Sequence, residues 1–214
     1  LAINASDVVG PAWNTVWVSV VAACVAVVAV LPTAMLLARY RSRVGPITGN
    51  VIISTFAMPG LIVALAMFFW TLRSSWAAEH LRGTLFVLVF AYVVRFGAQA
   101  LGAAQIAVAA VPDRLHDSAR VLGAGSFRRL ATVDAPLVTP GLLAGGGLVL
   151  LSTMKELPIT LLVAPFDFPT LTTKIFQSFE DAFVAEAGLL AMVLVFLSGA
   201  LTWFLVVRRA DHLD

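Results

Sequence analysis

Long apolar runs, each close to the length of a membrane span, dominate the hydrophobic pattern of this chain. They cover residues 13–37, 50–70, 84–106, 138–154 and 187–207. A helix of about 20 apolar residues crosses the ~30 Å hydrocarbon core of a bilayer. Because lipid offers the backbone no hydrogen bonds, such runs form helices. The pattern therefore predicts an all-α polytopic membrane protein with about five transmembrane helices.

One polar insertion, residues 111–136, interrupts this apolar pattern. Apolar residues recur within it at helical spacing, at Val111, Leu115, Ala119 and Leu122. Pro112 suits the first turn of a helix, and Gly123 suits a left-handed residue that ends one. Ser126 is a candidate cap for a second short helix. The insertion is thus predicted to be a helix–turn–helix between two spans.

Composition supports the membrane class. The chain has 214 residues, of which 60% are hydrophobic and 12% charged, and its mean hydropathy is +0.96. A soluble domain of this size could not bury so much apolar surface, so residues 1–214 are expected to form one transmembrane domain in the lipid bilayer. The net charge of +2 gives no reason to expect a nucleic-acid partner.

The sequence offers little chemistry of its own. The single cysteine, Cys24, lies inside a predicted span, and the three histidines show no metal-ligand spacing. The sequence contains no Gly-x-x-x-x-Gly-Lys-Ser/Thr loop, so any ATP and Mg²⁺ would be bound by another chain. No nucleophile–base constellation is present either. We therefore expect no enzyme activity and no resident metal or cofactor in this chain.

Basic residues predict the orientation, because loops rich in Lys and Arg face the cytoplasm. Nine arginines follow the first span, lie in the 107–137 loop or follow the last span: Arg39, Arg41, Arg43, Arg114, Arg120, Arg128, Arg129, Arg208 and Arg209. The other loops hold four basic residues: Arg73, Arg82, Lys155 and Lys174. The polar insertion and the C-terminus are therefore predicted to be cytoplasmic, with the N-terminus outside.

The polar insertion carries a spacing that resembles a known motif. The positions concerned are Asp117, Ser118, Ala119, Gly123, Val133, Ala135 and Pro136. Their spacing is similar, without a gap, to the EAA loop of ABC-transporter permease subunits: Glu-Ala-Ala, three residues, Gly, nine residues, Ile-x-Leu-Pro. Asp in place of Glu keeps the charge, and the other exchanges keep small or apolar character. The alternative is an amphipathic cytoplasmic loop with no partner.

The resemblance implies an ABC-importer permease fold in which residues 111–136 dock on an ATP-binding subunit. The residues it assigns to coupling are Leu115, Asp117, Ser118, Ala119, Arg120, Leu122, Gly123 and Pro136. Asp117 and Arg120 would make polar contacts with the ATPase, and the Leu115/Leu122 face would sit in its groove or against the bundle. The implied partners are two ATP-binding cassette subunits, a second permease half or subunit and a solute-binding protein.

Three further segments resemble ferric-iron permeases of the binding-protein-dependent class in the cell inner membrane: residues 91–96, 154–162 and 166–171. Related thiamine, sulfate and phosphonate permeases carry similar stretches, so another solute is the alternative to iron. Such iron permeases often hold two homologous halves in one chain. A first residue other than Met, here Leu1, and an outside N-terminus suit the second half of a longer fused permease.

Four residues are candidates for a polar path through the spans: Pro59, Arg95, Gln99 and Glu156. Pro59 could free a carbonyl in the second span, although proline is common in membrane helices. Arg95, with Gln99 one turn later, would face a wet cavity or hydrogen-bond a carbonyl of a neighbouring helix. Glu156 suits a hard cation, but one carboxylate is no metal site, and an interfacial pair with Lys155 is the alternative.

Two other classes of membrane protein are weighed against this interpretation. A secondary transporter usually places intramembrane acids at a broken helix, and no Asp or Glu lies within the first three predicted spans. A purely structural membrane subunit would not need the EAA-like spacing.

Overall fold

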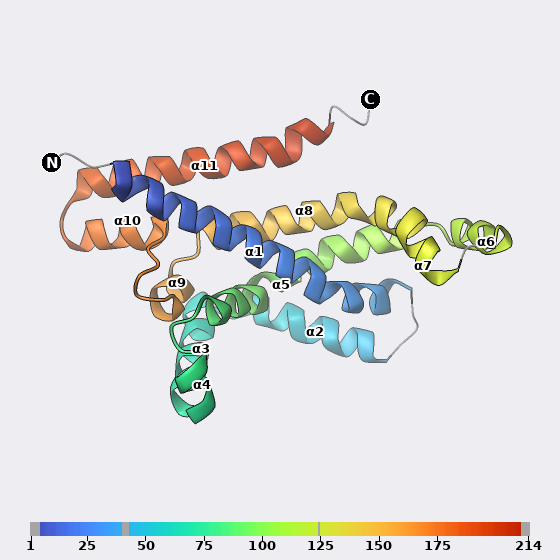
Figure 1. The fold of residues 1–214 in the computed structure, drawn as a ribbon, viewed down its shortest axis with the longest axis horizontal. Coiled ribbons are helices and arrows are strands. Elements are labelled where there is room, and N and C mark those ends of the chain that lie inside the picture. The colour runs from blue at the N-terminus through green and yellow to red at the C-terminus, as the bar shows by residue number, and fades with distance from the viewer. Residues whose placement is uncertain (1–4, 40–42, 124, 211–214) are drawn as a thin grey trace.

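The computed structural model describes residues 5–39, 43–123 and 125–210, and no strand occurs among them (Figure 1). The elements are α1 (Ala5–Ala38), α2 (Val44–Ala57), α3 (Gly60–Arg73), α4 (Ser75–His80), α5 (Leu85–Ala109), α6 (Asp113–Val121), α7 (Ser126–Arg129), the π-helical turn η1 (Leu130–Asp134), α8 (Ala135–Met154), α9 (Pro158–Val163), α10 (Leu171–Glu180) and α11 (Val184–Ala210). Four helical stretches within these residues are long and apolar enough to cross a membrane, or five if the bent pair α2–α3 is one span. The predicted all-α membrane class is confirmed.

The core of the bundle is formed by α1, α5 and α8, which pack against one another (Figure 1). Helix α5 lies between its neighbours and buries the side chains of Leu88, Tyr92 and Leu101 almost completely. Helix α11 packs beside α10 and part of α8. The loop that holds α6 and α7 extends from the far end of this bundle, where α5 ends and α8 begins.

Small residues allow α5 and α8 to approach closely. Gly141 and Gly145 have the Gly-x-x-x-Gly spacing that lets membrane helices meet backbone to backbone. A Cβ built on Gly145 would lie 2.8 Å from the Cβ of Ala103 and 3.2 Å from the Cα of Ala100. A Cβ on Gly141 would collide with Ala107. Gly141 and Gly145 therefore lie in the contact between these two helices.

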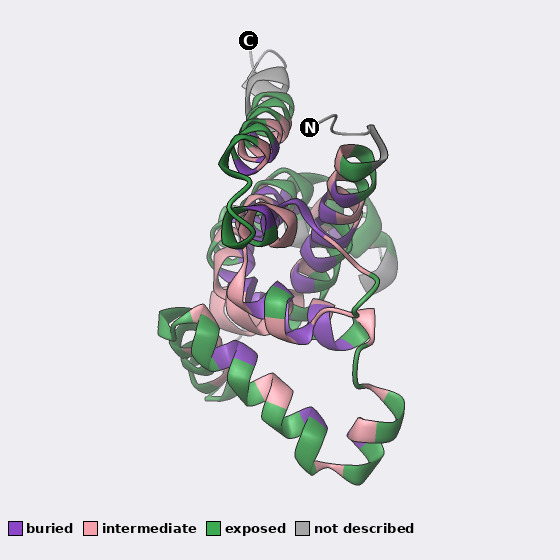
Figure 2. Ribbon diagram, turned by 90° about the vertical axis from the view of Figure 1, so that its left-hand side faces the viewer, coloured by how far each residue is buried: buried purple, intermediate pink, exposed green. Residues whose placement is uncertain are grey.

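Apolar side chains also cover much of the outer surface, as expected for helices surrounded by lipid or by other membrane chains. Val28 is 70% exposed, Ile106 73% and Phe196 77%. Figure 2 shows exposed positions running along the outward sides of the long helices, with buried positions gathered between them.

The second predicted span, residues 50–70, differs from the expectation of one spanning helix. Helices α2 and α3 meet at an angle of 106°. Met58 and Pro59 are extended, with ψ of 140° and 139°, since proline has no N–H to donate and disfavours a helical residue before it. The break falls at Pro59, and charged side chains lie at both helix ends, as described below.

The stretches between spans hold more helix than predicted. The expected loop 71–83 contains α4, whose first turn is capped by the side chain of Ser74. The stretch 155–186, between the last two predicted spans, contains α9 and α10. Helix α10 begins with a reciprocal cap, in which Thr170 and Thr173 each accept a hydrogen bond from the other's backbone N–H.

Candidate functional site

The polar insertion folds as the predicted helix–turn–helix. Pro112 precedes α6 and its carbonyl accepts from the Leu115 N–H at 3.1 Å, so the helix begins where the sequence indicates. After α6 ends, Gly123 adopts a φ of +75°, the left-handed conformation that glycine reaches without a Cβ clash. The first turn of α7 is closed by the Arg129 N–H bonding the Gly125 carbonyl at 2.9 Å. Gly125 directly precedes α7, which begins at Ser126; the side chain of Ser126 lies outside the described residues, so its predicted capping role stays a prediction.

The predicted apolar face of α6 divides into a buried and an open part. Val111 and Ala119 are buried against the rest of the chain. Leu115 is half-exposed, and Leu122 is 83% exposed beside Val121 at 87%. Val121 and Leu122 thus form an open apolar pair at the C-terminal end of α6.

The other coupling candidates of this loop are exposed where the structure describes their side chains. Asp117 and Ser118 are exposed on α6, and the Ser118 hydroxyl donates to the Arg114 carbonyl at 2.9 Å. Pro136 lies in the first turn of α8 and is exposed. The side chains of Arg120 and Ser126 lie outside the described part of the structure, so the contact predicted for Arg120 stays a prediction.

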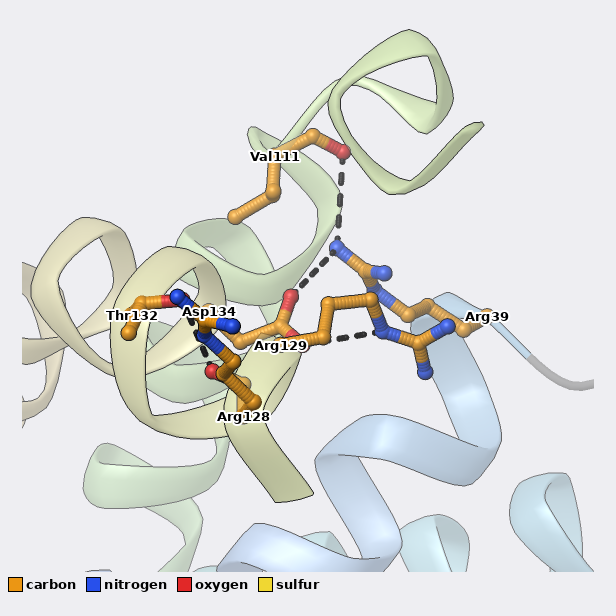
Figure 3. A network of polar contacts seen from close by, with 6 residues as sticks. All are labelled: Arg39, Val111, Arg128, Arg129, Thr132 and Asp134. Atoms are coloured by element: carbon orange, nitrogen blue, oxygen red, sulfur yellow. Dashed lines mark hydrogen bonds and ion pairs between the residues drawn. The ribbon is translucent and has the colours of Figure 1, made fainter. Parts of the chain in front are cut away.

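The two ends of the loop are joined to the C-terminal end of α1 (Figure 3). The Arg39 guanidinium lies 3.6 Å from an Asp134 carboxylate oxygen and donates to the Val111 carbonyl at 3.5 Å. The other Asp134 oxygen lies 3.8 Å from Nε of Arg129. Nothing in the hydrophobic pattern of the sequence indicated these contacts, because they join residues 39, 111 and 134 across three elements.

A second polar cluster surrounds the break between α2 and α3. Arg95 of α5 donates to the carbonyl of Phe56 and lies over the Phe56 ring, 5.3 Å from its centroid. This carbonyl belongs to the last turn of α2, where the helix dipole favours a cation. Of the two possibilities for Arg95, the hydrogen bond to a neighbouring helix is therefore present. Phe56 itself was missed, since only the break makes its carbonyl available.

Glu156 faces the other side of the same break. A Cβ built on Gly60 would lie 2.8 Å from Oε1 of Glu156, so the carboxylate lies directly against the first residue of α3. The same oxygen accepts from the Ile159 N–H at 3.3 Å. An anion at a helix N-terminus is stabilised by the unpaired N–H groups and the dipole. Glu156 thus binds backbone, rather than simply extending into solvent with Lys155.

The four path candidates are only partly brought together. Pro59 is exposed at the break, and its carbonyl accepts from the Ile62 N–H at 3.0 Å, so it is not free. Gln99 lies one turn along α5 from Arg95 and accepts from the Ser152 hydroxyl at 2.9 Å. Arg95 and Glu156, of opposite charge, therefore flank the broken helix, and the hydrogen bond between Gln99 and Ser152 lies one turn further along α5. No group of three or more His, Cys, Asp and Glu able to hold a metal ion occurs among the described residues.

Comparison with known proteins identifies the family. The family described as "Binding-protein-dependent transport system inner membrane component" matches residues 30–212. The Fe(3+)-transport system permease protein FbpB 2 of Haemophilus influenzae is 30% identical over 186 residues, which are 87% of this chain and 36% of that protein. The putative 2-aminoethylphosphonate transport system permease protein PhnV of Salmonella typhimurium is 27% identical over 152 residues, 71% of this chain and 55% of that protein. The chain thus spans about a third to a half of the length of these relatives.

Among solved structures, the MetNI methionine ABC transporter in an inward-facing conformation matches with a TM-score of 0.72 at 18% identity, covering 97% of this chain and 96% of the matched one. This likeness establishes the fold of an ABC-importer permease, with the helix–turn–helix as part of it. The family match extends over most of the chain and includes the whole loop 111–136. The chain therefore belongs to the binding-protein-dependent transport system inner membrane components, the permeases of ABC importers.

Proposed function

We propose that this chain is the permease part of an ATP-driven importer that passes ferric iron delivered by a solute-binding protein. The observation that carries the coupling part is the exposed Val121/Leu122 pair beside Asp117, on a loop whose two ends are fixed to the bundle. Two ATP-binding subunits would each receive such a loop, one from this chain and one from a second permease half. ATP and Mg²⁺ would bind in those subunits.

The mechanism follows from this placement. Closure of the ATP-binding subunits around ATP displaces the loop 111–136, and the loop displaces the ends of α5 and α8 that carry it. Because interfaces of packed helices switch between discrete arrangements, a small displacement can change which side of the bundle is open. In the proposed orientation this loop and the C-terminus are cytoplasmic, and α10 faces the side on which the binding protein docks.

Ferric iron is supported by the relative from Haemophilus influenzae, which carries that name and has the higher identity. 2-Aminoethylphosphonate is the second candidate, supported by the Salmonella relative. Neither solute has a defined ligand set among the described residues of this chain. A permease does not need one, since it has to release its solute rather than retain it.

Uptake by cells that carry the complete transporter decides between the solutes. We expect accumulation of labelled ferric ion, and none of 2-aminoethylphosphonate, thiamine or sulfate above the level in cells without the transporter. Energy-depleted cells serve as the control, because an ATP-driven importer stops when ATP is exhausted. Uptake of 2-aminoethylphosphonate without iron would remove the iron assignment and leave the importer assignment intact.

Arg95 is proposed to hold the broken helix in shape and to border the path. Arg95→Ala leaves the Phe56 carbonyl at the end of α2 without this donor, which costs about 1–3 kcal/mol where water cannot replace it. We expect reduced uptake and a lower melting temperature of the purified protein. The matched control is Arg73→Ala, an exposed arginine in the last turn of α3. Equal uptake and stability of both variants and the wild type would contradict a role for Arg95.

A further inference from the structure

Arg39 is the residue that joins both ends of the loop to another span. Val111 lies just before α6, and Asp134 lies just before α8, so they mark the start and the end of the helix–turn–helix. The Arg39 guanidinium reaches both, through the Val111 carbonyl and the Asp134 carboxylate (Figure 3). Asp134 falls at the unspecified position of the Ile-x-Leu-Pro motif, and Arg39 lies outside the motif altogether. The contact is therefore separate from the EAA-like pattern.

The charges at this junction hold the contact in place. The exposed fractions of the Arg39, Asp134 and Arg129 side chains are 19%, 13% and 21%. A partly buried ion pair is screened less by salt than an exposed one. Asp134 lies between two arginines, one from α1 and one from α7, so a displacement of η1 that keeps this carboxylate paired displaces α1 as well.

The N-terminal half of α1 is bound to the segment between α9 and α10 and to the first residue of α10. The Asn14 side chain donates to the Pro169 carbonyl at 2.9 Å, and the buried Thr15 hydroxyl accepts from the Leu171 N–H at 2.9 Å. The Trp17 ring meets Phe168 edge-on with 5.5 Å between centroids. Helix α1 is continuous from Ala5 to Ala38 with Pro32 inside it, and the stretch from Thr15 to Ala38 is about 35 Å long at 1.5 Å per residue. It therefore connects the loop at one end to the α9–α10 segment at the other.

We infer that Arg39 is a positioning residue for energy coupling. It holds both ends of the loop on α1, and α1 carries the displacement of the loop along its length to the α9–α10 segment. This inference rests on the coupling role proposed above. It adds a route by which ATP-driven movement reaches the far face of the bundle, beside the direct connections through α5 and α8.

The test compares Arg39→Gln with Arg43→Gln in the complete transporter, purified with its ATP-binding subunit and reconstituted in vesicles. Arg43 is an exposed arginine just before α2 and lies outside the loop 111–136. The measured quantity is the amount of solute transported per ATP hydrolysed. We expect Arg39→Gln to lower this ratio by about tenfold, within the range of typical coupling energies, while the ATP-binding subunit still co-purifies. Arg43→Gln should leave it unchanged.

The same measurement separates positioning from a purely structural role. Loss of folded protein lowers the yield of complex but leaves transport per ATP unaltered in the complex that remains. Asp134→Asn should lower the ratio as well, and the loss in the double variant with Arg39→Gln should be smaller than the sum of the two single losses, because both changes remove the Arg39–Asp134 contact. A ratio equal to that of the wild type in Arg39→Gln, or fully additive losses, would overturn the inference.

The α9–α10 end of α1 offers an independent variant. Thr15→Val keeps the side-chain volume and removes the hydroxyl that accepts from Leu171. Thr48→Val on α2 is its control, since that hydroxyl bonds only its own helix in the contacts described, at 3.0 Å to Val44 and Gly45. We expect the lower ratio only in Thr15→Val, and an unchanged ratio there would also overturn the inference. If the wild type itself shows no ATP-dependent transport, the proposed importer function fails first.

Discussion

Replacing Gly123 with valine is expected to disconnect ATP hydrolysis from transport while the membrane helices stay in place. Gly123 has a φ of +75°, and a Cβ there would meet no atom within 4 Å, so the cost is backbone strain rather than a clash. A left-handed residue with a Cβ costs about 1–2 kcal/mol, and more for a β-branched one. The turn relaxes, and the exposed Leu122 beside it shifts away from its docking position.

Gly83 provides a matched control for this substitution. It also has a positive φ, +66°, with no atom within 4 Å of a built Cβ, and it lies in the turn between α4 and α5. Gly83→Val therefore introduces the same kind of strain on the other side of the bundle. We expect it to transport normally per ATP, whereas Gly123→Val should lose coupling or release the ATP-binding subunit.

Asp117→Lys is expected to act on the same surface without altering the backbone. Asp117 is exposed on α6, so reversing its charge leaves the fold intact and changes only what a docked partner meets. The measurement for both loop variants is reconstituted transport together with ATP hydrolysis stimulated by the binding protein. Coupled transport at the wild-type level in both would mean that residues 111–136 are not the coupling element.

The largest effect on stability is expected from Gly145→Leu. The helix crossing leaves no room for a side chain, because a Cβ there already lies 3.3 Å from the Ala100 carbonyl oxygen, and backbone cannot rotate away as a side chain can. Overpacking costs about 1–3 kcal/mol when side chains can adjust, so we expect at least this loss. The melting temperature in detergent should fall sharply, with little folded protein recovered.

Gly199→Leu on α11 is the control for that substitution, since no atom lies within 4 Å of a Cβ built on Gly199. It should behave as the wild type. A melting temperature of Gly145→Leu equal to that of the control would contradict the described crossing of α5 and α8.

Much of the fold could be predicted because single helices in lipid are determined locally. An uncharged run such as residues 13–37 must form the hydrogen bonds of its own backbone N–H and C=O groups as a helix, and α1 includes the whole run. The loop helices were predictable for a similar reason, since Pro112 and Gly123 act through their own backbone conformations. The Gly141–Gly145 spacing is likewise local, and it permits a close approach whatever the partner helix is.

What could not be predicted depends on residues far apart in the chain. Pro59 indicated only a free carbonyl within one spanning helix, whereas the structure has a 106° break between α2 and α3, with Arg95 and Glu156 at the two helix ends. The Arg39–Asp134 contact joins residues 95 positions apart, and both residues also read as ordinary loop charges. Tertiary packing determines such contacts, and the hydrophobic periodicity of the sequence does not predict them.

Site-specific photo-crosslinking in the assembled transporter tests the central claim that the loop 111–136 contacts an ATP-binding subunit. A photoreactive amino acid is placed at Leu122, 83% exposed on the loop, or at Phe166, fully exposed between α9 and α10. We expect the probe at Leu122 to capture the ATP-binding subunit and the probe at Phe166 not to. Capture at Phe166 with none at Leu122 would contradict both the coupling role of the loop and the proposed orientation.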